Sequence, residues 1–71
     1  MKTKLRNYFV KYEVYGSVKL IHKKSDFISL VVNKNTSALE INDKIIHIIK
    51  VKYPDFAHEK IIIEITDISK L

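Results

Sequence analysis

The sequence predicts an α+β domain, in which a three- or four-stranded, mainly antiparallel sheet carries one amphipathic helix on one face. Three observations support this fold class. Residues 7–15 alternate with the period of a strand. Residues 37–53 repeat their apolar side chains at helical spacing, and residues 60–68 alternate again. Because a single helix covers only one face of a sheet, the other face is left for solvent or a partner.

Length and composition indicate one domain, residues 1–71, with short loops. Hydrophobic residues make up 46% of the chain, and glycine and proline occur once each, which argues against disorder. There is no cysteine, so disulfides and thiolate metal sites are excluded. No apolar run is long enough to cross a membrane, and Lys11 and Glu13 interrupt any signal-peptide core. We therefore expect a soluble, cytoplasmic protein.

The first half of the chain is predicted to form strands. Tyr8, Val10, Tyr12 and Val14 alternate with the intervening residues, and the only glycine follows at Gly16-Ser17, which indicates a turn. Residues 18–24 alternate again, as a short second strand or as the continuation of a long hairpin. The polar run 23–26 has the composition of a turn, and the apolar run 27–32 that of another strand.

A helix is predicted from Ser37 to Tyr53. Ser37 and Glu40 have the spacing of a capping box, in which each side chain satisfies a free backbone N–H of the first turn. The residue before Pro54 avoids the helical region, so the helix ends at Tyr53. One broad side of the helical wheel is apolar and is expected to face the sheet: Leu39, Ile41, Ile45, Ile46, Ile48, Ile49 and Tyr53.

The last predicted strand, residues 60–68, is the most hydrophobic. We therefore expect it inside the sheet and not at an exposed edge. Isoleucines at alternate positions place one side of this strand on the core. The predicted core is Val10, Tyr12, Val14, Leu30, Val32, Ile41, Ile45, Ile49, Ile61, Ile63 and Ile65.

The net charge of +5 is unevenly distributed along the chain. Residues 1–24 hold seven Lys or Arg against one acid, a net charge of +6, whereas residues 25–71 hold six Lys against seven acids. Such an asymmetry is typical of proteins with an anionic partner, although it also serves solubility. Twelve of the thirteen basic residues are Lys, which disfavours base-specific nucleic-acid recognition, since that chemistry uses Arg.

By alternation, the uncovered sheet face mixes aromatic, aliphatic and basic side chains, and a one-residue slip of register would invert the two faces. The residues expected on that face are Phe9, Lys11, Glu13, Tyr15, Lys19, Ile21, Lys23, Ile62 and Glu64. A patch of this kind is typical of an interaction surface. The residues predicted to bind a partner are Phe9, Lys11, Tyr15, Lys19, Lys23 and Lys24.

No motif indicates catalysis, a cofactor or a metal. His22, His47 and His58 lie on different predicted elements, and no pair has the helical spacing of zinc ligands. The serines lack the flanking glycines of a nucleophile elbow, and Gly16 alone cannot form a phosphate-binding loop. We therefore expect a protein that is not an enzyme.

The layout resembles a group of short proteins encoded by phages and mobile elements. The resemblance rests on the opening strand Tyr8-Phe9-Val10-Lys11-Tyr12, followed by a second strand at 27–32, a helix at 37–53 and an aliphatic strand at 61–71. That group includes inhibitors of host defence, such as anti-CRISPR proteins, which occupy a surface of a larger complex. Many of them are acidic mimics of nucleic acid, whereas this chain is basic.

The sequence thus leaves three hypotheses. The first is a non-catalytic binding protein of the anti-CRISPR type, which docks on a host protein complex in the bacterial cytoplasm by covering an acidic protein surface or contacting bound nucleic acid. The second is a small basic nucleic-acid-binding protein that stacks bases on sheet aromatics. The third is a module that self-associates through a sheet edge, forming a homodimer.

Overall fold

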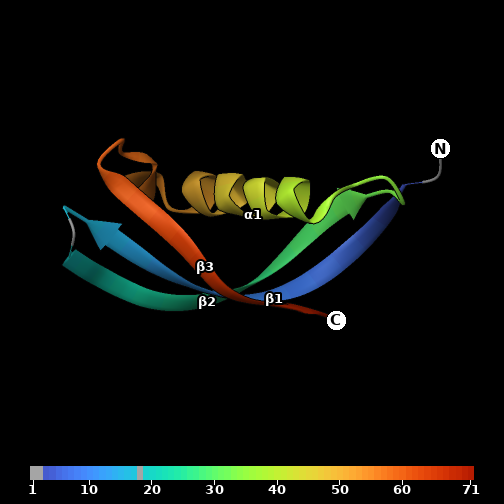
Figure 1. The fold of residues 1–71 in the computed structure, drawn as a ribbon, viewed down its shortest axis with the longest axis horizontal. Coiled ribbons are helices and arrows are strands. Elements are labelled where there is room, and N and C mark those ends of the chain that lie inside the picture. The colour runs from blue at the N-terminus through green and yellow to red at the C-terminus, as the bar shows by residue number, and fades with distance from the viewer. Residues whose placement is uncertain (1–2, 18) are drawn as a thin grey trace.

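A computed structural model describes residues 3–17 and 19–71 and shows a sheet with an α-helix on one face (Figure 1). Its elements, in chain order, are β1 (Lys4–Gly16), β2 (Lys19–Val32), α1 (Ala38–Lys52), the short 3-10 helix η1 (Pro54–Ala57) and β3 (Ile61–Lys70). Within the described residues the three strands form one antiparallel sheet in the order β2-β1-β3. The predicted α+β fold class is confirmed.

One long hairpin, β1–β2, makes up most of the sheet. Its register runs from Lys4 opposite Val32 to Gly16 opposite Lys19, with an irregularity beside Val14 and Tyr15. The polar run 23–26 is part of β2 and not a turn, because its residues pair with the middle of β1. The prediction of two short strands was therefore wrong and the long-hairpin alternative is confirmed over residues 19–32, while Val18 lies outside the described residues.

The predicted turn lies at Ser17, and Gly16 is the last residue of β1. Ser17 has φ of 50°, in the left-handed region, whereas Gly16 has no positive φ. A Cβ on Gly16 would lie 2.6 Å from Ile21 Cδ1 and 3.2 Å from Ile61 Cδ1. The absence of a side chain at Gly16 therefore makes room for two isoleucine side chains. The left-handed backbone conformation of the turn is adopted by Ser17 instead.

The central strand is β1, and β3 lies at an edge. The prediction that the last strand lies inside the sheet was therefore wrong. Only one side of β3 is covered: Ile63 is 8% exposed, whereas the adjacent Ile62 is 64% exposed. A run of isoleucines thus makes this strand apolar on both sides without making it central, although such runs are typical of strands buried on both faces.

The helix begins where the sequence predicts, because Ser37 accepts a hydrogen bond from the backbone N–H of Glu40 at 3.1 Å. At the other end the N–H of Tyr53 bonds to the carbonyl of Ile49 at 2.9 Å, and Pro54 then opens η1. Ile45 and Ile49 are buried, and three further isoleucines pack partly against the core. Leu39, which the helical wheel places on the apolar side but which is not among the predicted core residues, is 71% exposed.

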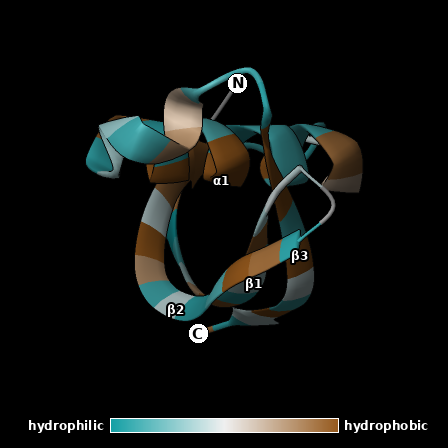
Figure 2. Ribbon diagram, turned by 90° about the vertical axis from the view of Figure 1, so that its left-hand side faces the viewer, coloured by the Kyte–Doolittle hydropathy of each residue, from teal (hydrophilic) through white to brown (hydrophobic). Residues whose placement is uncertain are grey.

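The core lies between α1 and the concave side of the curved sheet. In Figure 2 the sheet forms a trough below α1, and hydrophobic bands of α1 lie on the side of the strands. Eight predicted core residues are buried, namely Val10, Tyr12, Val14, Leu30, Val32, Ile45, Ile49 and Ile63, while Ile41, Ile61 and Ile65 are partly buried against them. Tyr8 and Ile28 complete the buried set. Among the described residues, no helix is long and apolar enough to cross a membrane.

Candidate functional site

The face of the sheet away from α1, called here the outer face, is not covered by another described element (Figure 1). Residues directly opposite each other in a ladder share a face, so the register fixes its composition. The odd-numbered positions of β1 point outward, because the even positions Tyr8 to Val14 are buried against the helix. Their outward neighbours include Leu20, Lys23, Ser25, Phe27, Ser29 and Val31 on β2 and Ile62, Glu64, Asp67 and Ser69 on β3.

Apolar side chains form three groups along the outer face. In the middle Phe9 packs on Phe27, with ring centroids 4.9 Å apart and an interplanar angle of 50°. The other two groups are Leu5 beside Val31 at the N-terminal end, and Tyr15 between Leu20 and Ile62 at the hairpin end. Phe27 is 73% exposed, Leu5 67% and Ile62 64%. Large apolar side chains thus remain in water on a sheet face without cover.

The charges of the outer face have both signs. Lys11 lies opposite Asp67, and Glu13 lies between Lys23 and Glu64. The Lys23 Nζ is 3.9 Å from a Glu13 carboxylate oxygen. Two lysines therefore accompany three carboxylates, and the described cations of residues 3–24 do not accumulate on this face.

Tyr15 is a hydrogen-bond donor on the outer face. Its hydroxyl donates to Glu13 Oε1 at 3.0 Å. The hydrogen bond to Glu13, followed by desolvation, raises the pKa of Tyr15 above its usual value. The phenol thus stays protonated at neutral pH, so it can form a hydrogen bond with a partner but cannot act as a base.

The structure brings together four of the six predicted binding residues: Phe9, Lys11, Tyr15 and Lys23 all lie on the outer face. Lys24 lies opposite Tyr12 on the helix side, with its Nζ 4.5 Å from the centroid of the Tyr53 ring. Lys19 is opposite Gly16, so it also belongs to the helix side.

The predicted outward position of Ile21 was wrong too, because its side chain fills the space beside Gly16. The irregularity next to Val14 and Tyr15 inverts the alternation of β2 near the hairpin end. Simple alternation through that segment therefore assigned Lys19 and Ile21 to the wrong face. The predicted outer face also omitted Phe27 and Leu20, whose side chains point outward. Phe27 could have been predicted from a single long hairpin, because it then pairs with Phe9.

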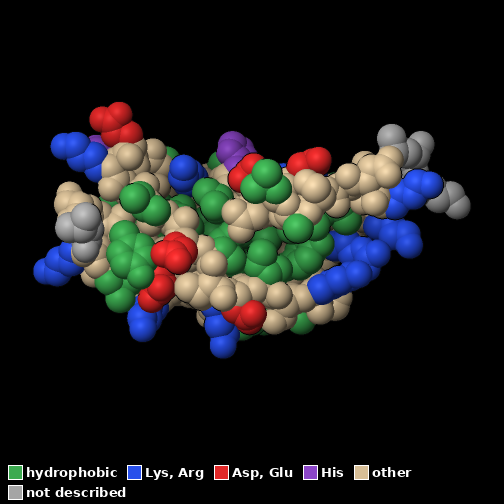
Figure 3. Space-filling model, in the orientation of Figure 1, with side chains coloured by type: hydrophobic (Ala, Val, Ile, Leu, Met, Phe, Trp, Pro, Cys, Tyr) green, Lys and Arg blue, Asp and Glu red, His purple; other side chains and the backbone are tan. Residues whose placement is uncertain are grey.

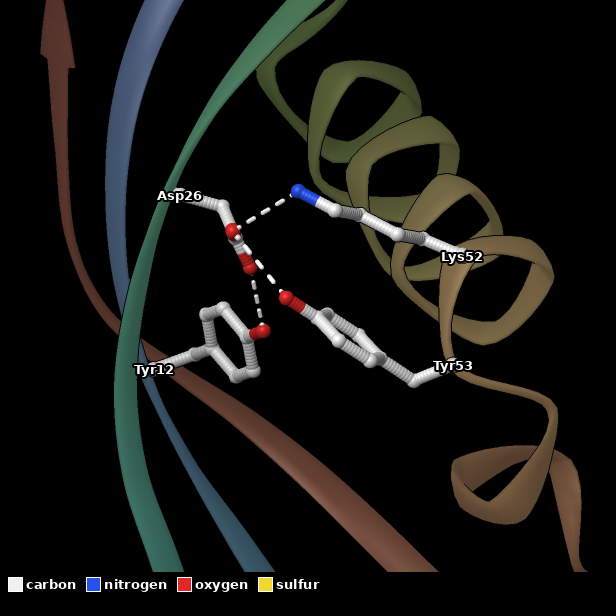
Figure 4. Close-up of polar contacts among 4 residues, drawn as sticks. All are labelled: Tyr12, Asp26, Lys52 and Tyr53. Atoms are coloured by element: carbon white, nitrogen blue, oxygen red, sulfur yellow. Dashed lines mark hydrogen bonds and ion pairs between the residues drawn. The ribbon is translucent and has the colours of Figure 1, made fainter.

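A second cluster of polar side chains ties the helix end to the hairpin on the opposite side of the sheet (Figure 4). Asp26 of β2 accepts a hydrogen bond from the Tyr12 hydroxyl at 2.5 Å. It also accepts one from Lys52 Nζ at 3.0 Å, at the end of α1, and one from the Tyr53 hydroxyl at 3.3 Å. Residues from three parts of the chain thus meet on one carboxylate.

The Asp26 cluster is built to hold a charge and not to transfer a proton. Partial burial by itself raises the pKa of Asp26, but the hydrogen bonds from Tyr12 and Lys52 outweigh it, so the pKa lies below its usual value. Burial, and then the hydrogen bond to Asp26, raise the pKa of Tyr12 far above its usual value. At neutral pH the carboxylate is ionised and the phenol protonated, so the cluster acts as a clamp.

Neither a metal site among the described residues nor a similar known protein was found that would point to a function. Across residues 3–17 and 19–71, no three His, Cys, Asp or Glu side chains gather as a metal site requires. The chain matches no protein-family model, no curated protein and no solved structure.

Proposed function

We propose that this chain is a non-catalytic binding protein that docks on another protein through its outer face. One observation carries the proposal: Phe27, Leu5 and Ile62 lie 64–73% exposed on a sheet face that no described element covers. Burying a side chain of this size yields roughly 1.5–3 kcal/mol. A partner that covers this face therefore gains substantial binding energy.

The distribution of polar groups supports a protein as the partner. Protein interfaces combine an apolar centre with polar and charged groups of both signs, as the outer face does with Lys11, Glu13 and Asp67. A nucleic-acid surface would instead be predominantly basic. Three carboxylates on the same face repel phosphates, so the outer face does not favour the nucleic-acid hypothesis.

The resemblance to phage and mobile-element proteins suggests the setting of this proposal. In that setting the partner is a host protein complex in the bacterial cytoplasm, and occupation of its surface inhibits it. The partner would match the outer face with apolar side chains opposite Phe27 and Ile62 and with carboxylates opposite Lys11 and Lys23.

The proposal is tested by affinity capture from a lysate of the cell of origin, followed by binding measurements with the purified candidate. We expect the variant F27S/I62S to lose at least tenfold in affinity, because both side chains are surface-exposed in the free protein. The matched control is L39S, since Leu39 is 71% exposed but belongs to α1. Circular dichroism should show that both variants are folded. Equal affinity of F27S/I62S and wild type for every captured protein would refute docking through the outer face.

A further inference from the structure

The N-terminal end of β1 extends beyond the end of β3. The pairing of these strands begins with Tyr8 opposite Lys70, and the N–H of Leu71 donates to the carbonyl of Asn7 at 2.9 Å. Residues 4–6 of β1 pair with β2 on one side and have no described strand on the other. The sheet therefore has a step, at which the central strand becomes an edge.

The backbone at this step has groups ready to pair. Along a strand, alternate residues direct their N–H and C=O to the same side. Since the carbonyl of Asn7 points toward the β3 side, that of Leu5 points there too, together with its N–H. Leu5 thus offers one donor and one acceptor at the open edge, as strand addition requires.

Positive charge surrounds the open edge. Lys4 and Arg6 lie on the helix-side face of β1, and Lys70 lies on the same face opposite Tyr8. None of the three forms an ion pair with a carboxylate in the part of the chain that the structure describes. Figure 3 shows blue side chains gathered at this end of the molecule, next to a hydrophobic band between α1 and the strands.

We propose that the edge of β1 at Lys4–Arg6 accepts an extended segment of another protein with the pattern acidic, apolar, acidic. A strand in line with β3 would place two residues opposite Lys4 and Arg6, on the face that carries these cations, so both positions favour a carboxylate. The residue between them would lie opposite Leu5 on the outer face. Leu5 is 67% exposed and its neighbour Val31 57%, so that position favours an apolar side chain.

A strand explains more of the site than a polyanion does. Phosphates would neutralise Lys4, Arg6 and Lys70, but they would leave the backbone groups of Leu5 and its exposed side chain without a role. A peptide segment with the proposed pattern would pair with the cations, with the backbone groups of Leu5 and with the Leu5 side chain at the same time. The site shares Leu5 with the outer face but contains neither Phe27 nor Ile62. The variants K4E/R6E and F27S/I62S therefore test the two proposals separately.

The probe is a heptapeptide with Glu at its third and fifth positions and Val at the second, fourth and sixth. We expect it to perturb the amide signal of Leu5 and to slow its hydrogen exchange, in NMR titrations up to about 1 mM peptide, where even weak complexes are populated. A peptide of the same composition with the two Glu adjacent places them on opposite faces and should bind at least fivefold more weakly. A single-stranded oligonucleotide of equal charge should leave Leu5 exchange unchanged.

Two protein variants separate charge from backbone pairing. K4E/R6E should weaken peptide binding at least tenfold, whereas K60E, with a charge reversal in the exposed turn before β3, should leave it unchanged. L5P removes the N–H at the open edge. The hydrogen bonds between β1 and β2 stay intact, since the N–H of Leu5 points away from β2. We expect this variant to bind the peptide more weakly as well. Circular dichroism shows whether each variant is folded, and F27S/I62S should bind the peptide normally.

Three results would overturn the proposal. One is absence of any Leu5 perturbation by the peptide, and another is equal binding of the adjacent-Glu peptide or the oligonucleotide, which would indicate a simple polyanion site. The third is a dimer in sedimentation that K4E/R6E dissociates, because the edge would then be occupied by a second copy of this chain.

Discussion

At the scale of single residues, Asp26 is the side chain whose role differs most from its sequence context. It stands in a polar run with the composition of a turn, yet it anchors three donors that lie 14, 26 and 27 residues away in sequence. No local pattern connects Asp26 with Tyr12 or Tyr53. Only the hairpin register and the end of α1 bring them together, so a sequence analysis has no means to find the cluster.

Replacing Asp26 by Asn should destabilise the fold at pH 7 by about 1–3 kcal/mol, because charge-assisted hydrogen bonds to Tyr12 and Lys52 are lost. The folded-state pKa of Asp26 is lowered, so its contribution is complete above the unfolded-state pKa of about 4 and disappears as pH falls through the folded-state value. The difference between wild type and D26N should therefore shrink in acid. Urea denaturation at several pH values measures it.

The matched control is D55N, at an exposed position of η1, which should unfold at the same urea concentration as the wild type at every pH. A D26N difference that stayed constant from pH 7 down to about pH 2–3 would show that the carboxylate charge has no part in the stabilisation.

At the scale of elements, the alternation of side chains along a strand decides which residues are buried in the core and which form the exposed surface. Phe27 and Ile28 are adjacent in β2, yet Phe27 is 73% exposed and Ile28 only 5%. Sequence alternation located both faces of β1 correctly. It failed in β2 near the hairpin end, because one irregular pair reverses the faces there and no local signal marks that position.

The pair Phe27 and Ile28 gives a direct test of the register. F27A should change the free energy of unfolding by less than about 1 kcal/mol, chiefly through the lost contact with Phe9. I28A should cost about 2–5 kcal/mol, and I28V about 0.5–1.5 kcal/mol if the alanine variant does not fold. Urea denaturation compares them. A loss above about 2 kcal/mol for F27A, together with no loss for I28V, would mean that the faces of β2 are inverted.

The helix was the most predictable element, because its signals are local. A cap at Ser37, an isoleucine repeat and Pro54 together specify its start, its buried side and its end. Leu39 is the exception, as an apolar residue of the first turn that remains exposed. A helical wheel predicts on which side of the helix a residue lies, but it does not predict which turns of the helix the sheet covers.

At the scale of the whole molecule, folding redistributes the charge asymmetry that the sequence shows. Of the described cations in residues 3–24, Lys11 and Lys23 lie on the outer face, whereas the other four lie on the helix side, at both ends and in the middle of the hairpin: Lys4, Arg6, Lys19 and Lys24. Composition counts these charges correctly, but their positions depend on which strand is central and on the register with β2. A single basic face was therefore a reasonable expectation that the strand order does not produce.

The strand order also predicts that β3 is indispensable. It supplies Ile63 to the core, packs Ile61 and Ile65 against it, and pairs with β1 from Tyr8 to Gly16. A chain that ends at His58 should therefore show no cooperative thermal transition by circular dichroism. The full-length variant I62S, altered only on the exposed side of β3, should keep its transition. Cooperative unfolding of the shortened chain would show that the hairpin and α1 are sufficient.

The central position of β1 has a consequence for the order of events during synthesis. Of the three described strands β1 is synthesised first, although it needs two neighbours, and its second neighbour, β3, follows only after β2 and α1. Roughly 50 residues separate them, which at about 5–20 residues per second corresponds to on the order of 3–10 s. During that interval the edge of β1 that later pairs with β3 stays open in the nascent chain. We therefore expect the chain to depend on chaperone protection or rapid translation more than a chain whose first strand is peripheral.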